Sequence, residues 1–211
     1  MNILELFSGT ESFSKVARER GHFCVTLDIE KRFNPIICKS ILDISGRELL
    51  NRYIYFDVIW ASPPCQSFSV ASIGKNWTEG KPASESAIQS INLVEKTLRL
   101  IKEINPKHFF IENPRAMLRK QEVMEGIPRK TVTYCQYGDK RMKPTDIWTD
   151  CESWRPRLMC KNGDPCHERA PRGSRTGTQG LKNSAERGKV PHELCLEIIQ
   201  VCERELKQEV E

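Results

Sequence analysis

The sequence predicts an α/β fold with a mostly parallel, doubly wound sheet. Short apolar runs alternate with amphipathic segments through the first half of the chain, and Gly, Pro and small polar residues separate them. Repeated β-α-β units of this kind place helices on both faces of an open sheet. Ligands of such sheets bind beyond the carboxyl ends of the strands. Polar residues that follow the expected strands are therefore the candidates for a functional site.

The first half of the chain alternates strand and helix patterns. The expected strands cover residues 2–7, 23–29, 41–44 and 56–61. A helix pattern over 12–20 stops at Gly21, a residue type common just past helix ends. After the third strand, Ser45 and Glu48 have the capping-box spacing that begins a short helix.

The second half begins with the clearest helix pattern of the chain. Apolar residues recur every three or four positions over 84–104, and Asn105-Pro106 ends the pattern. Further strands are expected at 108–111, 131–137 and 146–149, and an amphipathic helix at 192–206. We expect three parts: an α/β domain over 1–150, a short basic insertion over 151–189, and a C-terminal helix over 190–211 that packs back on the domain.

Positive charge is concentrated in the basic insertion. The chain has a net charge of +5, and residues 151–190 hold nine Lys or Arg against four Asp or Glu. Such a patch favours phosphate contacts, although a solvated loop has the same composition. Trp154 offers a surface for base stacking. The arginines expected to contact nucleic acid are Arg155, Arg157, Arg172 and Arg175.

Nine cysteines occur without a secretory signal pattern, which favours reduced thiols and a cytoplasmic protein. No apolar stretch approaches the length of a membrane span. Cys151, Cys160, Cys166 and His167 are clustered and could bind zinc. Their spacing lacks the paired Cys-x-x-Cys of a zinc ribbon, so we expect thiols in a loop and no metal.

The loop after the first strand and the acids after the next two indicate a ligand site. Phe7-Ser8-Gly9-Thr10 is a small glycine-bearing turn whose backbone amides can approach a ligand closely. Asp28 stands where an acid can bind the two hydroxyls of a ribose. Asp43 could accept from an adenine amino group. Together these residues suggest an adenosine-containing cofactor; strand-end capping or solvation is the alternative for both acids.

A cysteine and a glutamate follow the next two strands. The prolines of Ser62-Pro63-Pro64-Cys65 fix the backbone and present Cys65 at the edge of the sheet, near an expected helix N-terminus, as a candidate nucleophile. The alternative is a structural cysteine in a turn. Glu112, in Glu112-Asn113-Pro114, is a candidate acid. Its alternative is a cap or half of an ion pair.

Three motifs stand in the order and spacing of a known family: Phe-x-Gly-Thr, Pro-Pro-Cys-Gln-x-Phe-Ser and Glu-Asn-Pro. In this arrangement the chain resembles the DNA cytosine-C5 methyltransferases over most of its length. The segments 133–138, 143–148 and 171–180 resemble the compact phage-type branch, with a reduced target-recognition region. The chain departs from the family at Glu11, where relatives have a second glycine, and at Pro114, where most have valine.

The resemblance implies a Rossmann-like class I fold and methyl transfer from S-adenosylmethionine to carbon 5 of cytosine in DNA. In this mechanism Cys65 adds to carbon 6 and Glu112 protonates or hydrogen-bonds nitrogen 3. Asn113 holds the loop of Cys65, and Arg141, from the segment 140–143, contacts the cytosine. The base must leave the duplex. The cofactor contacts that the resemblance implies are Phe7, Ser8, Gly9, Thr10, Asp28, Ile29, Asp43, Ile44 and Pro63.

DNA is the expected partner, and no membrane is expected. Gln66 and Ser67, directly after the nucleophile, join the arginines as expected DNA contacts. Two alternatives stay open. The short basic insertion also suits the same chemistry on tRNA or on a free cytosine nucleotide. The second alternative is a non-catalytic nucleic-acid-binding module on this fold, although such a module would be expected to lose Cys65 or Glu112.

Overall fold

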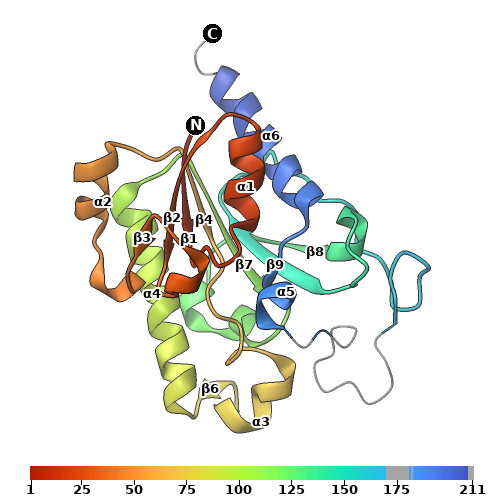
Figure 1. Cartoon of the computed structure of the whole chain (residues 1–211). Helices are drawn as coiled ribbons and strands as arrows, with labels where there is room; N and C mark the ends of the chain where they lie inside the picture. Colours follow the sequence, from red (N-terminus) through yellow and green to blue (C-terminus); the bar gives the residue numbers. More distant parts are fainter. Residues whose placement is uncertain (170–180, 182, 209–211) are drawn as a thin grey trace.

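One seven-stranded sheet organises the protein, whose computed structural model describes residues 1–169, 181 and 183–208 (Figure 1). The strands lie in the order β3-β2-β1-β4-β7-β9-β8. Every neighbouring pair is parallel except the two that involve β9. Their bounds are β1 (Asn2–Leu6), β2 (Phe23–Asp28), β3 (Ile37–Cys38), β4 (Val58–Ala61), β7 (His108–Pro114), β8 (Arg129–Thr133) and β9 (Pro144–Thr149). The expected mostly parallel sheet is confirmed.

The strand order reverses between β1 and β4. The chain moves outward from β1 to β2 and β3, then crosses back so that β4 pairs with the other side of β1. A crevice opens at such a switch point, outside the carboxyl ends of the two central strands. The loops after β1 and β4 therefore border the position where this sheet can bind a ligand.

Helices cover both faces of the sheet. Helices α1 (Ser12–Glu19) and α6 (His192–Gln208) lie side by side on one face, and α2 (Gly46–Tyr53) and α4 (Glu85–Ile104) pack on the other (Figure 1). Alternating strand residues supply two cores: Ile3 faces α1 and α6, and Leu4 faces α2 and α4. The C-terminal helix thus packs on the α/β unit.

The start of α1 depends on a buried carboxylate of β1. The N-cap residue Glu11 has a left-handed backbone and makes no side-chain cap. Glu5 accepts hydrogen bonds from the backbone N–H groups of Phe13 (3.3 Å) and Ser14 (2.8 Å) instead. Since these amides have no partner within the helix, Glu5 replaces the missing cap. Burial raises the pKa of Glu5 to about 7.

The cap predicted at Ser45 is confirmed for α2, and α4 begins with a similar serine cap. Ser45 accepts a hydrogen bond from the Glu48 N–H, and Ser84 accepts one from the Ala87 N–H. Asn105 ends α4 with a left-handed backbone. The loops hold further short elements: η1 (Lys31–Phe33), η3 (Val70–Ser72), α3 (Ile73–Asn76), β5 (Trp77–Thr78), β6 (Lys81–Pro82), η4 (Met117–Lys120), η5 (Glu122–Met124) and α5 (Ser184–Gly188).

Three expected strands differ from the structure by more than two residues at an end. The third, at 41–44, is wrong: a 3-10 helix, η2 (Ile41–Asp43), forms there because Ser40 caps the Leu42 N–H, and β3 precedes it. The strand expected at 131–137 ends at Thr133, where the 3-10 helix η6 (Tyr134–Tyr137) begins. The strand expected at 108–111 continues to Pro114 because β9 pairs with it to the end. Among the described residues, no helix is both long and apolar enough to span a membrane.

Candidate active site

The loop after β1 is tied to the end of β2. Phe7 and Gly9 have positive φ values of 56° and 46°, which turn the chain sharply between strand and helix. The Ser8 N–H donates to the Leu27 carbonyl (3.1 Å), and the Gly9 N–H donates to the Asp28 carboxylate (2.8 Å). The other Asp28 oxygen accepts from the Glu30 N–H (2.8 Å). Asp28 thus fixes the two loops that border the first part of the crevice.

Several features of these loops fit the adenosine part of a cofactor. The Ser8 hydroxyl is buried without a hydrogen-bond partner among the described residues, so it is available to form a hydrogen bond with a ligand. Ile29 is 68% exposed directly after Asp28 and can cover an adenine ring. Asp43 is exposed, as a contact to an adenine amino group requires. The Ile44 side chain is 3% exposed in the core, which leaves the backbone of Ile44 for the expected cofactor contact.

The segment that precedes α6 lies beside this first loop. The Val190 N–H donates to the Ser12 hydroxyl (3.2 Å), and that hydroxyl lies 3.3 Å from Oγ1 of Thr10. Residues nearly 180 positions apart in the chain are therefore joined at the edge of the crevice. The segment before α6 thus packs against the glycine-bearing turn.

The loop that carries Cys65 is held from the neighbouring strand. Asn113 is fully buried in β7, and its Nδ2 donates to the Pro63 carbonyl (3.0 Å). This bond forms because β4 ends opposite Ile111, so the loop after Ala61 runs beside the last residues of β7. The expected role of Asn113 is confirmed.

Cys65 is half-buried in a turn, and its carbonyl accepts from the Phe68 N–H (3.1 Å). The expected helix N-terminus at Cys65 is wrong, because the next helical turn begins only at Val70. The rigid prolines and the Asn113 contact, rather than a helix dipole, present this thiol.

Glu112 lies in β7, directly before Asn113, and is 5% exposed. The hydroxyl of Tyr134 donates to its Oε1 (2.8 Å), and Nζ of Lys143 lies 3.8 Å from the same oxygen. Lys143 Nζ also lies 4.5 Å from the centre of the Tyr134 ring and donates to the Arg187 carbonyl (3.1 Å). Both groups thus fix one oxygen of the carboxylate.

Electrostatics connect Cys65 to the same group of residues. Burial raises the pKa of the Cys65 thiol, and the charge of Glu112 raises it further, whereas Lys143 and Arg187 lower it. Burial and Glu112 also raise the pKa of Tyr134 well above its usual range, so Tyr134 is a neutral donor. The pKa of the half-buried Cys65 thiol therefore depends on the buried carboxylate of Glu112 and on the ammonium group of Lys143.

Arg141 lies elsewhere. Its guanidinium pairs with Asp139 and donates to the carbonyls of Glu186, Arg187 and Lys189. It therefore holds the segment before α6 rather than a substrate base, and the structure does not support the expected contact of Arg141 with cytosine. Sequence reasoning missed Lys143 and Tyr134: the segment 140–143 was singled out, but only side-chain direction identifies which cation faces Glu112.

The expected DNA contacts separate into three groups. Gln66 and Arg155 are exposed, and within the described part of the chain the Arg155 guanidinium donates to the Glu152 carbonyl. Ser67 is 4% exposed and shares hydrogen bonds with Ser86 and Ser90 of α4, so a DNA contact through its hydroxyl is wrong. Arg172 and Arg175 lie outside the described residues, as does most of the expected motif 171–180.

Arg157 and Trp154 make contacts within the fold. Arg157 pairs with Glu193 (2.6 Å) and Glu197 (3.1 Å) of α6, which neutralise its charge. Trp154 is completely buried, and its ring packs edge-on against Phe110 at 6.2 Å between centroids. The expectation of a stacking surface at Trp154 is therefore wrong, whereas the phosphate contact of Arg157 stays a prediction that requires its ion pairs to open.

The expected cysteine cluster is also changed. Cys151 is completely buried, and its sulfur lies 3.9 Å from Oε2 of Glu205. Cys160, Cys166 and His167 are joined by Cys135 instead. Cys135 is distant in sequence, and only the turn of η6 after β8 brings it there.

Comparison with known proteins identifies the family. A family model for C-5 cytosine-specific DNA methylase matches residues 1–129. The "Probable DNA (cytosine-5)-methyltransferase" of Frog virus 3 (isolate Goorha) is 32% identical over 222 residues, which cover 96% of this chain and 100% of the viral protein. The Type II methyltransferase M.AquIA of Picosynechococcus sp. is 29% identical over 126 residues, 57% of this chain and 47% of that protein.

Solved structures show the same fold. A protein named as a DNA modification methyltransferase, encoded within an E. coli prophage, aligns with a TM-score of 0.54 at 18% identity, covering 76% of this chain and 52% of the other. The Entamoeba histolytica methyltransferase EhMeth aligns with a TM-score of 0.52 at 19% identity, covering 76% and 57%. This chain spans about half the length of these two proteins, and its sheet has their Rossmann-like methyltransferase fold. By its sequence match over more than half its length and its full-length viral relative, the chain belongs to the C-5 cytosine-specific DNA methylase family.

Proposed function

We propose that this protein transfers a methyl group from S-adenosylmethionine to carbon 5 of cytosine in DNA, with Cys65 as the covalent nucleophile. One observation carries the proposal: two consecutive residues of β7, Glu112 and Asn113, act on the Cys65 thiol and on the loop that holds it. Asn113 holds the loop of Cys65 through the Pro63 carbonyl, and Glu112 lies close enough for its charge to act on the thiol. Family membership supports the same chemistry.

The residues divide the chemistry between them. The Cys65 thiolate adds to carbon 6 of cytosine, and the electron pair of the 5,6 double bond moves to carbon 5. Glu112 stabilises the developing charge by protonating or hydrogen-bonding nitrogen 3. When a base removes the proton from the substituted carbon 5, the double bond re-forms and Cys65 leaves as a thiolate. Cytosine must leave the duplex stack for this attack.

The environment of Glu112 suits this role. Tyr134 and Lys143 both contact Oε1, so Oε2 is the oxygen that can face nitrogen 3 of the base. Two fixed partners hold the carboxyl plane before substrate arrives, and such preorganisation lowers the cost of reaching the transition state. Lys143 has a second effect, because its charge also favours the thiolate of Cys65. We therefore assign the basic residue of this site to Lys143 instead of Arg141.

S-adenosylmethionine, when bound, supplies an electrophilic methyl group to carbon 5. The residues that would hold it are those of the first two loops, with Phe7, Gly9 and Thr10 around the turn and Ser8 offering its unpaired hydroxyl. Asp28 keeps free lone pairs on both oxygens for ribose hydroxyls, since each accepts only one backbone bond. Ile29 and Asp43 would contact the adenine, and Pro63 would contact the methyl-bearing end.

DNA is the proposed substrate, and the region that reads it is small. Between β9 and α6 only the basic insertion is available, which supports a reduced target-recognition region. Gln66 beside the nucleophile and Arg155 on the insertion are the exposed candidates for contact. The phage-type branch stays a prediction, because the relative that matches the whole chain comes from a frog virus.

A label-transfer experiment tests the proposal. The protein is incubated with methyl-tritiated S-adenosylmethionine and, in parallel, duplex DNA, single-stranded DNA, tRNA or dCMP. We expect 5-methylcytosine in DNA and no product with Cys65→Ala, a variant that should bind cofactor and melt like the wild type. Label confined to tRNA or dCMP would keep the chemistry and overturn the substrate. Equal labelling by Cys65→Ala would overturn the nucleophile.

A further inference from the structure

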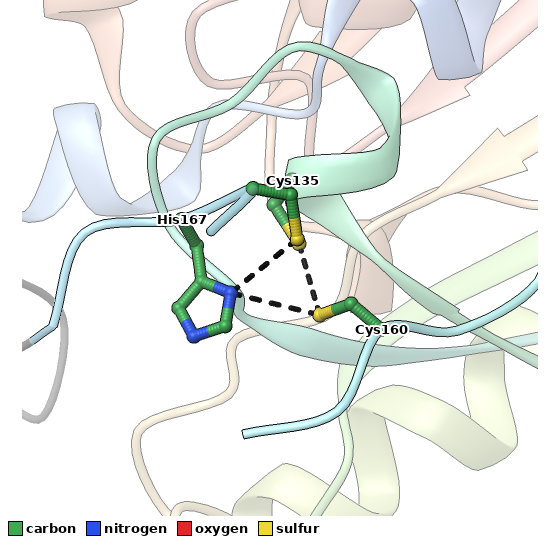
Figure 2. Close-up of side chains that lie close together, drawn as sticks. Cys135, Cys160 and His167 are labelled. Carbon is green, nitrogen blue, oxygen red and sulfur yellow. Dashed lines mark hydrogen bonds between the residues drawn. The ribbon is translucent and has the colours of Figure 1, made fainter. Parts of the chain in front are cut away.

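Four potential metal ligands converge just after β8, the edge strand of the sheet. The thiols of Cys135, Cys160 and Cys166 and the imidazole of His167 have ligand atoms that all lie within 4.8 Å of one another. Figure 2 shows Cys135, Cys160 and His167 pointing toward a common centre. All three cysteines are free thiols.

The distances match the coordination shell of one ion. A tetrahedral zinc ion separates neighbouring sulfurs by about 3.8 Å and sulfur from nitrogen by about 3.5 Å. The sulfurs of Cys135 and Cys166 lie 3.6 Å apart. Nδ1 of His167 lies 3.7 Å from the Cys160 sulfur and 3.5 Å from the Cys166 sulfur. The sulfurs of Cys135 and Cys160 lie 3.1 Å apart, so an ion would separate this pair slightly.

Backbone and side-chain contacts outside the cluster hold three of these four ligands in place. The Cys160 N–H donates to the Thr133 hydroxyl (3.1 Å), which joins this residue to the end of β8. The backbone N–H of Glu168, the residue after His167, donates to the Lys140 carbonyl (2.9 Å). Nε2 of Gln136 donates to the Cys166 sulfur (3.4 Å), the kind of outer contact that stabilises a metal-bound thiolate.

The part of the chain that holds three of these ligands lacks regular secondary structure. Residues 152–169 form no helix or strand, and a segment of this size cannot build its own core. A metal ion that joins Cys160, Cys166 and His167 to Cys135 would fix the segment on the sheet. Cys166 is exposed and His167 half-buried, so an ion can enter from solvent.

We propose that Cys135, Cys160, Cys166 and His167 bind one structural zinc ion, which attaches the basic insertion to the edge of the sheet. Three thiolates and an imidazole are the donor set that selects zinc over the harder divalent cations. On binding, the three thiols release three protons and form three sulfur–zinc bonds, and His167 donates the lone pair of Nδ1. Four protein ligands fill the tetrahedron, which leaves no position for a catalytic water. This site does not depend on the proposed function.

Metal analysis of matched variants tests the site. The full-length protein is purified without chelator from zinc-supplemented cells, and its metal content is measured by mass spectrometry. We expect about one zinc ion per chain in the wild type and in Cys38→Ser, and loss of zinc in Cys166→Ser. Cys38 and Cys166 are both exposed cysteines, but only Cys166 belongs to the cluster, so Cys38→Ser controls for the loss of an exposed thiol. Replacement by Co²⁺ should give the visible bands of a tetrahedral thiolate site.

Three results would overturn the proposal. The first is a folded wild-type protein that lacks zinc and gives no thiolate bands with Co²⁺. The second is zinc that persists in Cys166→Ser but disappears in Cys151→Ser, which would place the ion at the separate group of His108, Cys151 and Glu205. The third is a disulfide between Cys135 and Cys160, found by peptide mapping of protein that was freshly purified with added zinc and without a reducing agent.

Discussion

The residues around Cys65 and the residues of the basic insertion are held in place by different means. Cys65 lies in the loop after β4 and Glu112 lies near the end of the neighbouring strand β7, and Asn113 of β7 is joined to that loop by a buried hydrogen bond. The insertion has no regular structure over 152–169 and is attached by single side chains, such as buried Trp154 and the ion pairs of Arg157. The first region has its geometry fixed by the sheet, whereas the second depends on individual contacts.

The largest effect is expected at the acid of the first region. Glu112→Gln keeps the shape of the side chain but cannot donate a proton from a carboxyl group to nitrogen 3. Methyl transfer should fall by about 10²–10⁴-fold, the usual contribution of a general acid. The measurement is kcat on duplex DNA, with cofactor affinity and melting temperature as controls. A rate within a few-fold of the wild type would show that Glu112 is only structural.

The buried carboxylate of Glu5 should make the stability of the protein depend on pH. The pKa of Glu5 is raised from 4.5 to about 7, so between these values the folded state binds a proton that the unfolded state has lost. The free energy of unfolding should therefore fall as pH rises through this range, by about 3 kcal/mol from this group. Denaturation of wild type and Glu5→Gln at several pH values measures the difference. Parallel pH curves for the two proteins would contradict the assignment.

The charges around Cys65 should be measurable through its reactivity. Lys143 favours the thiolate and Glu112 opposes it, so Lys143→Met should move alkylation of Cys65 to higher pH, and Glu112→Gln should move it to lower pH. Iodoacetamide labelling, resolved by peptide mass spectrometry, separates Cys65 from the exposed Cys38 and Cys166. Shifts of the same sign in both variants would show that the thiol responds to changes in structure instead of charge.

The smallest effect is expected within the basic insertion. Arg155 is exposed and has no carboxylate partner among the described residues, whereas Arg157 is paired with two glutamates. Arg155→Gln should weaken DNA binding uniformly across sequences and reduce the slope of log affinity against log salt by about one. Arg157→Gln should leave that slope unchanged and lower the melting temperature. The opposite pattern would mean that the ion pairs of Arg157 open to receive phosphate.

The contrast between the two regions also explains how much the sequence could predict. The carboxyl ends of parallel strands meet at one edge of a sheet, so motifs that follow predicted strands converge whatever the details of packing. The expected contact of Asn113 and the positions of Asp28, Cys65 and Glu112 follow from this topology. Errors in strand boundaries, such as the extension of β7 to Pro114, left these positions close to the crevice.

Side-chain direction in irregular segments could not be predicted in this way. Ser67 turns inward because α4 offers Ser86 and Ser90 as partners, and nothing near Ser67 in the sequence indicates this. The cysteine cluster required Cys135, which the turn after β8 delivers from outside the insertion. Lys143 rather than Arg141 faces Glu112 for the same reason: only the folded loop decides which way each side chain points.

Covalent trapping tests the central claim most directly. In DNA that contains 5-fluorocytosine, carbon 5 carries fluorine instead of a removable proton, so the adduct between Cys65 and carbon 6 cannot be released after methylation. With S-adenosylmethionine present, the account predicts a stable protein–DNA complex whose modified peptide contains Cys65, and no complex with Cys65→Ala. A protein that methylates unmodified DNA while the trapped peptide carries another cysteine, or while no complex forms, would contradict it.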